Sequence, residues 1–357
     1  MNTSLLLQLI ATLAIPMLIV LAWTAVRRSL RGRRPVQTPV AALTVRVRRI
    51  VDEAADIKSF ELVSADGSTL PAWSAGAHID VRIDDETVRQ YSLCGAPGAR
   101  DTYRIAVKNA PDSRGGSRAM HQRVSVGDTL AISGPRNHFE LVDGARHYVL
   151  IAGGIGITPL LAMAQELQAR GASYELHYFT RSIAETAFHE VLSSEPYADK
   201  VNFHHPAADR VRELLQPLLG KCPQGHHLYM CGPRRFTDLI GEVTAGIWPP
   251  DAIHLEYFSA DPAAKTAPSD AFEVKLQRSG RTIPVAAGRS IVEALCAHGI
   301  DVATSCREGV CGTCLTGVIA GTPDHRDAFL SAKERKAGDK IMICVSRAKS
   351  GQLVLDI

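Results

Sequence analysis

Four cysteines near the C-terminus have types and spacing that suit iron–sulfur chemistry. Cys306, Cys311 and Cys314 follow one another as C-x4-C-x2-C, and Cys344 comes after 29 intervening residues. This spacing is typical of a [2Fe–2S] site, in which two irons need four thiolates. We therefore predict that one loop supplies three ligands and that a distant element supplies the fourth.

Other interpretations of the cysteines are weaker. Gly309 and Gly312 suit a loop that turns tightly and aims backbone N–H groups at sulfides. A zinc site is the alternative, but zinc sites usually pair two C-x2–4-C units in matched halves. The chain has eight cysteines, which could form four disulfides, yet 357 residues can build a core without them. Cys296 falls in a predicted helix and is interpreted as a packed core thiol.

A glycine-rich turn in the middle of the chain suits a pyrophosphate. An apolar run over residues 148–152 predicts a buried parallel strand, and Gly154 and Gly156 follow it. Glycine lets the backbone approach phosphate, and a helix N-terminus favours its charge. Thr158 as N-cap and Pro159 as first helical residue fit the start of a helix. The spacing is not that of G-x-G-x-x-G, and a structural strand–helix turn is the alternative.

A second phosphate loop is predicted at Gly115, Gly116 and Ser117, just before a helical pattern. Small residues and a hydroxyl at a helix start can cradle a phosphate. A plain glycine-rich turn is the alternative reading.

The elements around these motifs predict three folded units of different class. Short strands separated by Gly, Asp and Pro predict an antiparallel β-barrel over residues 42–143. Strands alternating with helices predict an α/β domain with a parallel sheet over 144–258. An Ala/Pro/Ser/Asp-rich linker at 259–270 precedes a hairpin and a helix, the latter with Ser290 as N-cap, in a last domain at 271–357.

The N-terminus predicts a membrane anchor. Residues 5–26 hold no charge and are long enough to span a hydrocarbon core of ~30 Å as a helix. Five arginines follow within residues 1–34, which places the body on the cytoplasmic side of an inner membrane, as a single-pass protein. A cleaved signal peptide is the alternative, but such peptides carry their positive charges before the apolar core.

Charge argues against nucleic acid as a partner. The formal net charge is +3, but residues 1–34 hold five arginines and no acid, so the remainder has 35 basic and 37 acidic residues. The basic balance thus belongs to one short cluster. No basic face or nucleic-acid-binding motif is recognisable, so we expect no nucleic-acid binding.

Several motifs resemble known redox families. Residues 271–357 resemble a plant-type ferredoxin domain with a β-grasp fold, supported by TPDHRDAFLS at 322–331 and CVSRA at 344–348. The turn at 153–160 resembles the G-G-x-G-x-T-P-[LM] motif of ferredoxin reductases. Residues 89–93 resemble the R-x-Y-S-L flavin motif of that superfamily, which implies flavin-binding roles for Arg89, Tyr91, Ser92 and Leu93.

The same resemblance implies further site residues. Cys231, Gly232 and Pro233 match a C-G-P motif that lies near the nicotinamide in the family. Phe258, with Tyr257 as the other candidate, would cover the flavin face. Lys108 would lie near the flavin phosphate, which the family binds at the position of Gly115, Gly116 and Ser117.

The order of the three units resembles the phthalate dioxygenase reductase and vanillate demethylase reductase family. That resemblance covers residues 42–357 and implies FMN as the flavin and NADH as the reductant. The connection from residue 108 to residue 114 is short, which leaves little room to bind an adenine and also favours FMN. Residues 180–182 (Thr-Arg-Ser) could bind a 2′-phosphate, so NADPH remains the alternative.

These observations predict an electron-transfer enzyme. NADH gives up two electrons as a hydride, whereas an iron–sulfur cluster carries one, and a flavin mediates between them. No acid–base catalytic residue is needed. The family implies a Rieske-type terminal oxygenase as partner. The predicted anchor favours another acceptor, such as a membrane monooxygenase or a haem protein, and a redox sensor is a third hypothesis.

Overall fold

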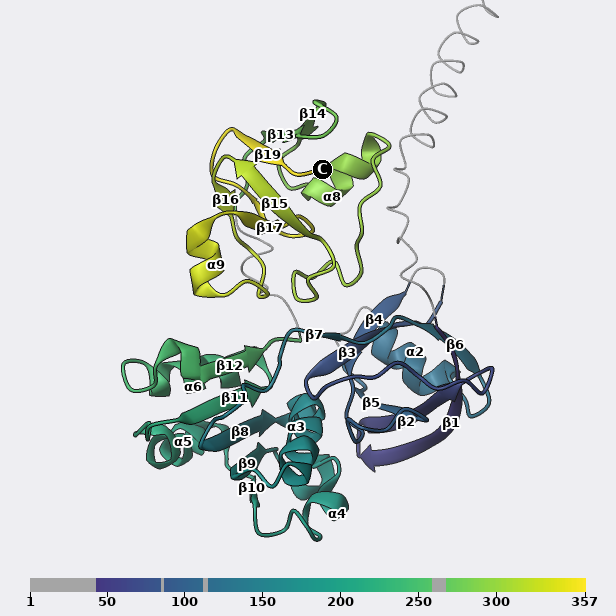
Figure 1. The fold of residues 1–357 in the computed structure, drawn as a ribbon, viewed down its shortest axis with the longest axis vertical. Coiled ribbons are helices and arrows are strands. Elements are labelled where there is room, and N and C mark those ends of the chain that lie inside the picture. Colours follow the sequence, from purple (N-terminus) through teal and green to yellow (C-terminus); the bar gives the residue numbers. More distant parts are fainter. Residues whose placement is uncertain (1–42, 85–86, 112–114, 259–267) are drawn as a thin grey trace, which may run out of the picture.

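The computed structural model describes residues 43–84, 87–111, 115–258 and 268–357. Figure 1 shows three folded units: a barrel domain, a parallel-sheet domain beside it, and a C-terminal domain above both. The predicted anchor and most of the predicted linker lie outside the described residues. None of the described helices has the length and apolar character needed to cross a bilayer.

The barrel domain is an antiparallel sheet of seven strands, as predicted. The strand order is β4-β3-β6-β1-β2-β5, with β7 paired to β3, and a bridge between Leu93 and Ile105 joins the two ends. Phe60, Leu62 and Tyr103 fill the interior and are completely buried. The elements are β1 (Leu43–Ala54), β2 (Ile57–Ser64), β3 (Ala77–Arg82), β4 (Val88–Ser92), β5 (Tyr103–Lys108), α2 (Gly116–Arg123), β6 (Thr129–Ile132) and β7 (Arg136–Asn137).

The parallel-sheet domain has five strands in the order β10-β9-β8-β11-β12. Helix α3 packs on one face of the sheet, and α5 and α6 pack on the other. The chain winds outward from β8 in one direction and from β11 in the other, so the carboxyl ends of β8 and β11 form a switch point where ligands bind. The elements are β8 (His147–Gly153), α3 (Ile157–Ala169), β9 (Tyr174–Phe179), α4 (His189–Leu192), β10 (Val201–His204), α5 (Val211–Leu219), β11 (His226–Cys231), α6 (Arg234–Thr244) and β12 (Ile253–Glu256).

The predicted start of the glycine-loop helix was wrong by two residues. Residues Gly154–Gly156 form a 3-10 turn, η1, that runs directly into α3 at Ile157. Thr158 is therefore inside the helix, where its Oγ1 donates to the carbonyl of Ile155 at 3.0 Å. It is not an N-cap, because Gly156 and Ile157 before it already have right-handed helical dihedral angles.

The C-terminal domain has the predicted β-grasp sheet, in the order β14-β13-β19-β15-β17. Ser290 caps α8 as predicted: its Oγ accepts from the N–H of Glu293, and the carboxylate of Glu293 accepts from the N–H of Ser290. The elements are β13 (Phe272–Leu276), β14 (Thr282–Val285), α8 (Ile291–Ala297), β15 (Leu315–Ala320), β16 (Pro323–Asp324), α9 (Ala332–Ala337), β17 (Lys340–Met342), β18 (Arg347–Ala348) and β19 (Gln352–Leu355).

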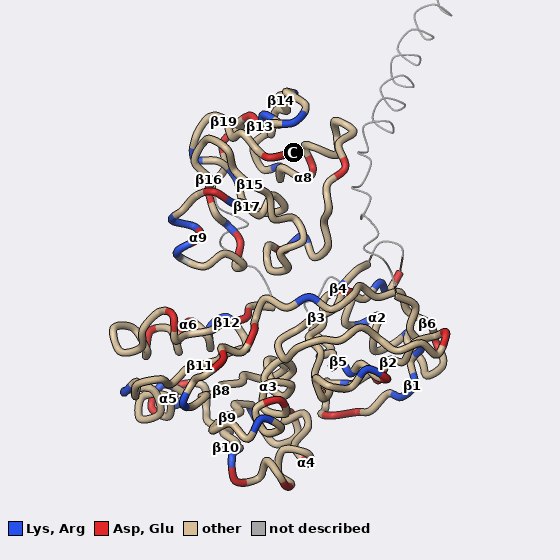
Figure 2. Tube along the Cα trace, viewed as in Figure 1, with Lys and Arg blue, Asp and Glu red and all other residues tan. Residues whose placement is uncertain are grey.

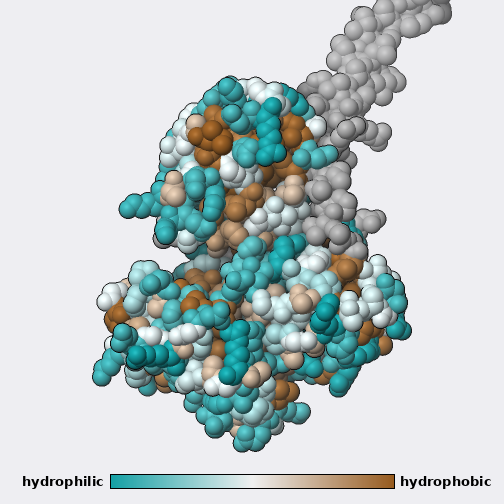
Figure 3. Space-filling view, in the orientation of Figure 1, coloured by the Kyte–Doolittle hydropathy of each residue, from teal (hydrophilic) through white to brown (hydrophobic). Residues whose placement is uncertain are grey.

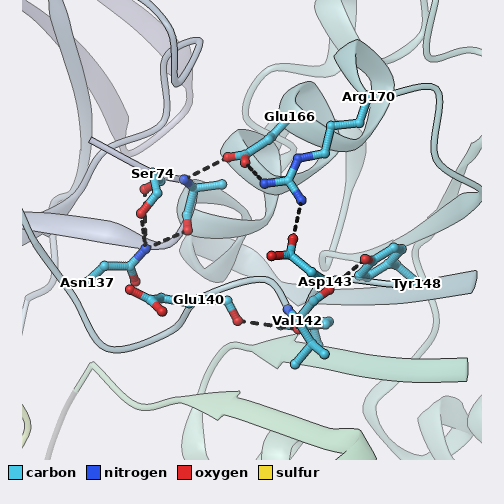
Figure 4. Close-up of polar contacts among 10 residues, drawn as sticks. Ser74, Asn137, Glu140, Val142, Asp143, Tyr148, Glu166 and Arg170 are labelled. Atoms are coloured by element: carbon cyan, nitrogen blue, oxygen red, sulfur yellow. Dashed lines mark hydrogen bonds and ion pairs between the residues drawn. The ribbon is translucent and has the colours of Figure 1, made fainter. Parts of the chain in front are cut away.

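Polar contacts join the barrel domain to the parallel-sheet domain (Figure 4). Glu166, on α3, accepts from the N–H of Ala75 at 3.0 Å and pairs with Arg170. Asn137 Nδ2 donates to the carbonyl of Ala75 at 2.8 Å, and Arg170 reaches Asp143 at 3.1 Å. The contacts of Glu166 and Arg170 cross between the two domains, whereas the Asn137 bond lies within the barrel domain next to them.

Candidate redox site

The four predicted cysteines come together in the C-terminal domain. Cys306 lies beside Cys311 and Cys344 lies beside Cys314, and all four cysteines are free thiols. Cys311, Cys314 and Cys344 are buried, whereas Cys306 is partly exposed. The structure thus brings the loop and the distant fourth cysteine into one cage.

Two glycines let the cysteine loop close. Gly309 and Gly312 have φ of 70° and 74°, which side chains rarely adopt. A Cβ at Gly309 would lie 2.5 Å from the side chain of Val345, and one at Gly312 would lie 2.6 Å from the ring of Phe329. The predicted need for glycine at both positions is confirmed.

The chemistry of the four thiols fits a two-iron cluster. Among the described residues, no three His, Cys, Asp or Glu side chains are arranged to hold a single metal ion. The thiols form two close pairs, and each pair could hold one iron of a two-iron cluster. The adjacent thiol and then burial raise the pKa of Cys306 and of Cys344, whereas the Cys306 thiol lowers the pKa of Cys311 to about 5. A bound metal centre would stabilise all four groups as thiolates. The N–H of Glu308 points at Cys306 Sγ at 3.3 Å, as expected around a cluster.

A cavity of about 240 Å³ lies where the three domains meet. Six of the predicted site residues line it: Tyr91, Ser92, Lys108, Ser117, Thr158 and Phe258. Val310, from the cysteine loop, lines the same cavity. The cavity therefore connects the barrel, the glycine turn and the cluster loop.

The lining of this cavity fits a flavin. Tyr91 Oη and His78 Nε2 are buried and have no hydrogen-bond partner among the described residues, so both can serve a polar ring edge. Gly115, with φ of 87°, caps α2. A Cβ at Gly116 would meet the side chain of Arg89 at 2.6 Å, so the predicted phosphate loop and Arg89 are adjacent.

Three predicted residues have different surroundings from those expected. Leu93 is completely buried in the barrel core and Pro159 is buried in α3, and neither lines the cavity. Lys108 lines it, but its Nζ forms an ion pair with Asp56 at 3.0 Å.

The glycine turn and the C-G-P segment meet at the predicted switch point. A Cβ at Gly156 would lie 2.1 Å from the carbonyl oxygen of Cys231, and one at Gly232 would lie 3.0 Å from the Cα of Gly153. Pro233 caps α6. Only glycine permits this contact between the two strand ends, so both turns are free to present backbone N–H groups to a ligand.

Two aromatic residues close the cavity and differ in how firmly they are held. The ring of Tyr257 lies under the guanidinium of Arg234 at 4.8 Å, and its hydroxyl donates to Asp238 at 3.4 Å. Phe258 is 42% exposed and is not held by such contacts in the described structure.

Glu256 is a site residue that the sequence patterns did not single out. It lines the cavity and is partly buried, and burial raises the pKa of its carboxyl to about 8. Ser92 Oγ donates to it across 3.5 Å, a long hydrogen bond. Burial, and next the proximity of Glu256, raise the pKa of Cys231 well above its ordinary value. Because its pKa is raised to about 8, the carboxyl of Glu256 is mostly protonated at neutral pH.

Two histidines link the cavity to the cluster loop, and they too were missed. His78 lines the cavity, and its ring centroid lies 5.9 Å from that of His138. The ring of His138 then contacts Phe329, with centroids 4.9 Å apart. Burial, and next Arg136, lower the pKa of both histidines, that of His78 to about 4, so both are neutral at pH 7.

Comparisons with known proteins agree with this site. The model of the 2Fe–2S iron–sulfur cluster binding domain matches residues 274–349. The vanillate O-demethylase oxidoreductase of Pseudomonas sp. (strain HR199 / DSM 7063) is 45% identical over 306 residues, which cover 85% of this chain and 96% of the relative.

Two solved structures share the fold. One is a phthalate dioxygenase reductase, described as a modular structure for electron transfer from pyridine nucleotides to [2Fe–2S]; it has a TM-score of 0.67 and 39% identity, over 89% of this chain and 98% of that one. The other, an intact type IV self-sufficient cytochrome monooxygenase, has a TM-score of 0.81 and 41% identity over 91% of this chain, which spans 43% of that protein.

One conclusion follows from the three domains, the four-cysteine cage and the full-length likeness to these reductases. The chain is an oxidoreductase and belongs to the phthalate dioxygenase reductase and vanillate O-demethylase oxidoreductase family, whose members combine a flavin, a pyridine nucleotide and a [2Fe–2S] cluster.

Proposed function

We propose that this chain is the reductase component of an oxygenase system, which takes electrons from NADH through FMN and [2Fe–2S] to a Rieske-type terminal oxygenase. The observation that carries the proposal is that Val310 of the cysteine loop lines the same cavity as the flavin-motif residues Tyr91 and Ser92. When bound there, the cofactors would accept a hydride from NADH and release its two electrons singly to two equivalents of acceptor.

The chain's own residues bind and orient. Gly115, Gly116 and Ser117 would hold the flavin phosphate at the start of α2, next to Arg89. Tyr91, Ser92 and Lys108 would contact the flavin. Gly154, Gly156, Cys231, Gly232 and Pro233 would bind the nucleotide at the switch point. We assign no acid–base catalytic residue to this set, because hydride and electron transfer by bound cofactors need none.

Phe258 is the residue that would cover the flavin face and move to admit nicotinamide. Its ring lines the cavity yet is 42% exposed, whereas Tyr257 is held by Arg234 and Asp238. We assign the mobile role to Phe258 on this difference.

An ion pair supports NADH over NADPH. Arg181 follows β9 at the edge where a nucleotide ribose binds in this type of fold. Its Nε and Nη2 lie 2.9 and 2.7 Å from the carboxylate of Glu185. The guanidinium that could bind a 2′-phosphate is thus already neutralised, and Glu185 would repel the phosphate.

The short connection from Lys108 to Gly115 supports FMN over FAD, because it leaves little room for an adenine site. The likeness to a phthalate dioxygenase reductase supports an oxygenase as partner, and the family resemblance implies that this oxygenase is of the Rieske type. A haem protein is the second candidate acceptor, supported by the likeness to the cytochrome monooxygenase.

Residues 5–26 support a single-pass anchor in the inner membrane, with the domains in the cytoplasm.

The absorption spectrum of anaerobically purified protein, before and after NADH, tests the scheme. We expect overlapping flavin and cluster bands, all bleached by NADH. Bleaching of the flavin without the cluster bands would reduce the protein to a flavin reductase. A colourless folded protein would contradict the proposal.

Membrane fractionation of the full chain and of a chain lacking residues 1–34 tests the anchor. If residues 1–34 do not anchor the protein, both chains would stay in the soluble fraction.

A further inference from the structure

An arginine-lined hollow of about 290 Å³ opens beside the cluster site of the ferredoxin domain. We call it the arginine hollow; it is lined by Arg289, Arg307, Arg326, Arg347 and Cys344, together with the acid Glu293. Figure 2 shows that acidic and basic residues are otherwise interspersed over the molecule, so four arginines around one hollow are a local concentration of charge.

Arg347 and Arg289, two of the arginines that line the hollow, differ in how they are held. Arg347 is 4% exposed, and its Nη2 donates to the carbonyls of Asp270 at 2.8 Å and Ala286 at 3.1 Å. These bonds fix the guanidinium through neutral carbonyls and leave its charge in place. Arg289 is exposed at the rim.

The acid of the lining does little to offset this charge. Glu293 Oε2 accepts from the N–H of Ser290 in the capping box of α8, which directs the carboxylate to the helix start. Arg326 Nε pairs with Asp324 Oδ2 at 2.8 Å, so Arg289 at the rim supplies the positive charge that the hollow exposes most to solvent.

The position of the hollow relative to the cluster is the second observation. Val310 of the cysteine loop faces the flavin cavity, and Phe329 beside that loop packs on His138 of the barrel domain. This side is occupied by the electron donor. Figure 3 shows the ferredoxin domain as a lobe that joins the rest of the molecule at a narrow waist. Cys344, a predicted cluster ligand, lines the hollow and so brings the cluster close to the surface there.

We infer that the arginine hollow is the docking surface for the electron acceptor, and that the acceptor presents acidic side chains to it. This inference rests on the proposed reductase function. Opposite charges steer the encounter and orient the partner, which matters for a complex that must form and separate at each one-electron transfer.

Two model acceptors of opposite charge test the inference with the full holoprotein. Cytochrome b5 presents an acidic haem edge, and cytochrome c presents a basic one. We expect Arg289→Glu to lower kcat/KM for cytochrome b5 at low salt by about tenfold, and to remove most of its decline with added salt. The same variant should raise kcat/KM for cytochrome c. The matched control is Lys275→Glu, which makes the same charge change at an exposed position on β13 outside the hollow.

A binding measurement without turnover completes the test. Calorimetric titration of oxidised cytochrome b5 in the absence of NADH should show affinity for the parent protein and for Lys275→Glu, and a clear loss for Arg289→Glu. The inference would be overturned if the two variants behaved equally. It would also be overturned if the parent reduced cytochrome c faster than cytochrome b5 and Arg289→Glu changed neither rate. NADH-dependent bleaching is read in the same samples: its absence counts against the reductase function, whereas its presence with equal variants counts against the docking surface alone.

Discussion

The imidazole of His138 packs edge-on against the phenyl ring of Phe329, with ring centroids 4.9 Å apart and ring planes at 80°. His138 belongs to the segment after β7 of the barrel domain, and Phe329 lies behind the cysteine loop of the ferredoxin domain. The same Phe329 ring fills the space that a side chain at Gly312 would need. This contact therefore positions the cluster loop on the domain that holds the flavin.

We predict that His138→Ala slows electron transfer from the flavin to the cluster. Loss of the ring contact would let the ferredoxin domain shift, and electron transfer slows as the flavin site and the cluster move apart. Stopped-flow absorbance should show slower cluster reduction after a normal flavin reduction by NADH. Ferricyanide reduction directly from the flavin should be unchanged.

The exposed barrel residue Val126 offers a control, because Val126→Ala truncates a side chain that does not line the flavin cavity. His138→Phe should restore much of the rate, since it keeps an aromatic edge against Phe329. Equal rates in His138→Ala and the parent would show that the ring contact does not set the distance.

Cys306→Ser separates the two electron routes. It removes one thiolate from the Cys306–Cys311 pair, so the cluster should be lost or unstable while the flavin cavity keeps its lining. We expect NADH-dependent cytochrome c reduction to fall by at least about tenfold and ferricyanide reduction to survive. Iron content and the visible spectrum give independent checks. Cytochrome c reduction that persists without iron would remove the cluster from the route.

Much of this site could be predicted from the sequence because its chemistry is local. The cysteine spacing, and the glycines at 309 and 312, reflect constraints within one loop. Contacts between domains have no such signal: Ser92 and Glu256 are 164 residues apart and meet only in the folded chain. Likewise His78, His138 and Phe329 belong to three different segments whose contact depends on domain packing.

The missed elements have physical reasons too. Strand β10 (Val201–His204) is partly exposed at the edge of the sheet, and its four residues, Val-Asn-Phe-His, are too short an alternation to predict a strand. The assignment of Thr158 as an N-cap was wrong because the glycines before it adopt a 3-10 turn that begins the helical path earlier. Propensity rules do not resolve such short transitions.

We predict that Glu185→Gln relaxes the choice of nucleotide. The substitution removes the carboxylate that pairs with Arg181, so the guanidinium becomes available for a 2′-phosphate and the repulsion disappears. A charge-assisted hydrogen bond of this kind corresponds to about a tenfold gain in kcat/KM for NADPH. The value for NADH should change little.

Two further variants make that result specific. Glu190→Gln makes the same chemical change at a nearby exposed position and should leave the nucleotide preference unchanged. Adding Arg181→Ala to Glu185→Gln should abolish the gain. If the parent already uses NADPH as well as NADH, the ion pair does not select the nucleotide.

The buried carboxyl of Glu256 should make stability fall with rising pH. Its pKa is raised from 4.5 to about 8 by burial, so the folded protein binds a proton there that the unfolded chain releases. This contribution is fully present below pH 4.5 and is lost as the pH rises through about 8. Glu256→Gln keeps a neutral group of the same shape and cannot ionise. Urea unfolding midpoints between about pH 5 and pH 9 should therefore decline less steeply in the variant, by an amount on the order of a few kcal/mol over the whole window. Parallel curves for the two proteins would mean that water reaches the carboxyl and that its pKa is ordinary.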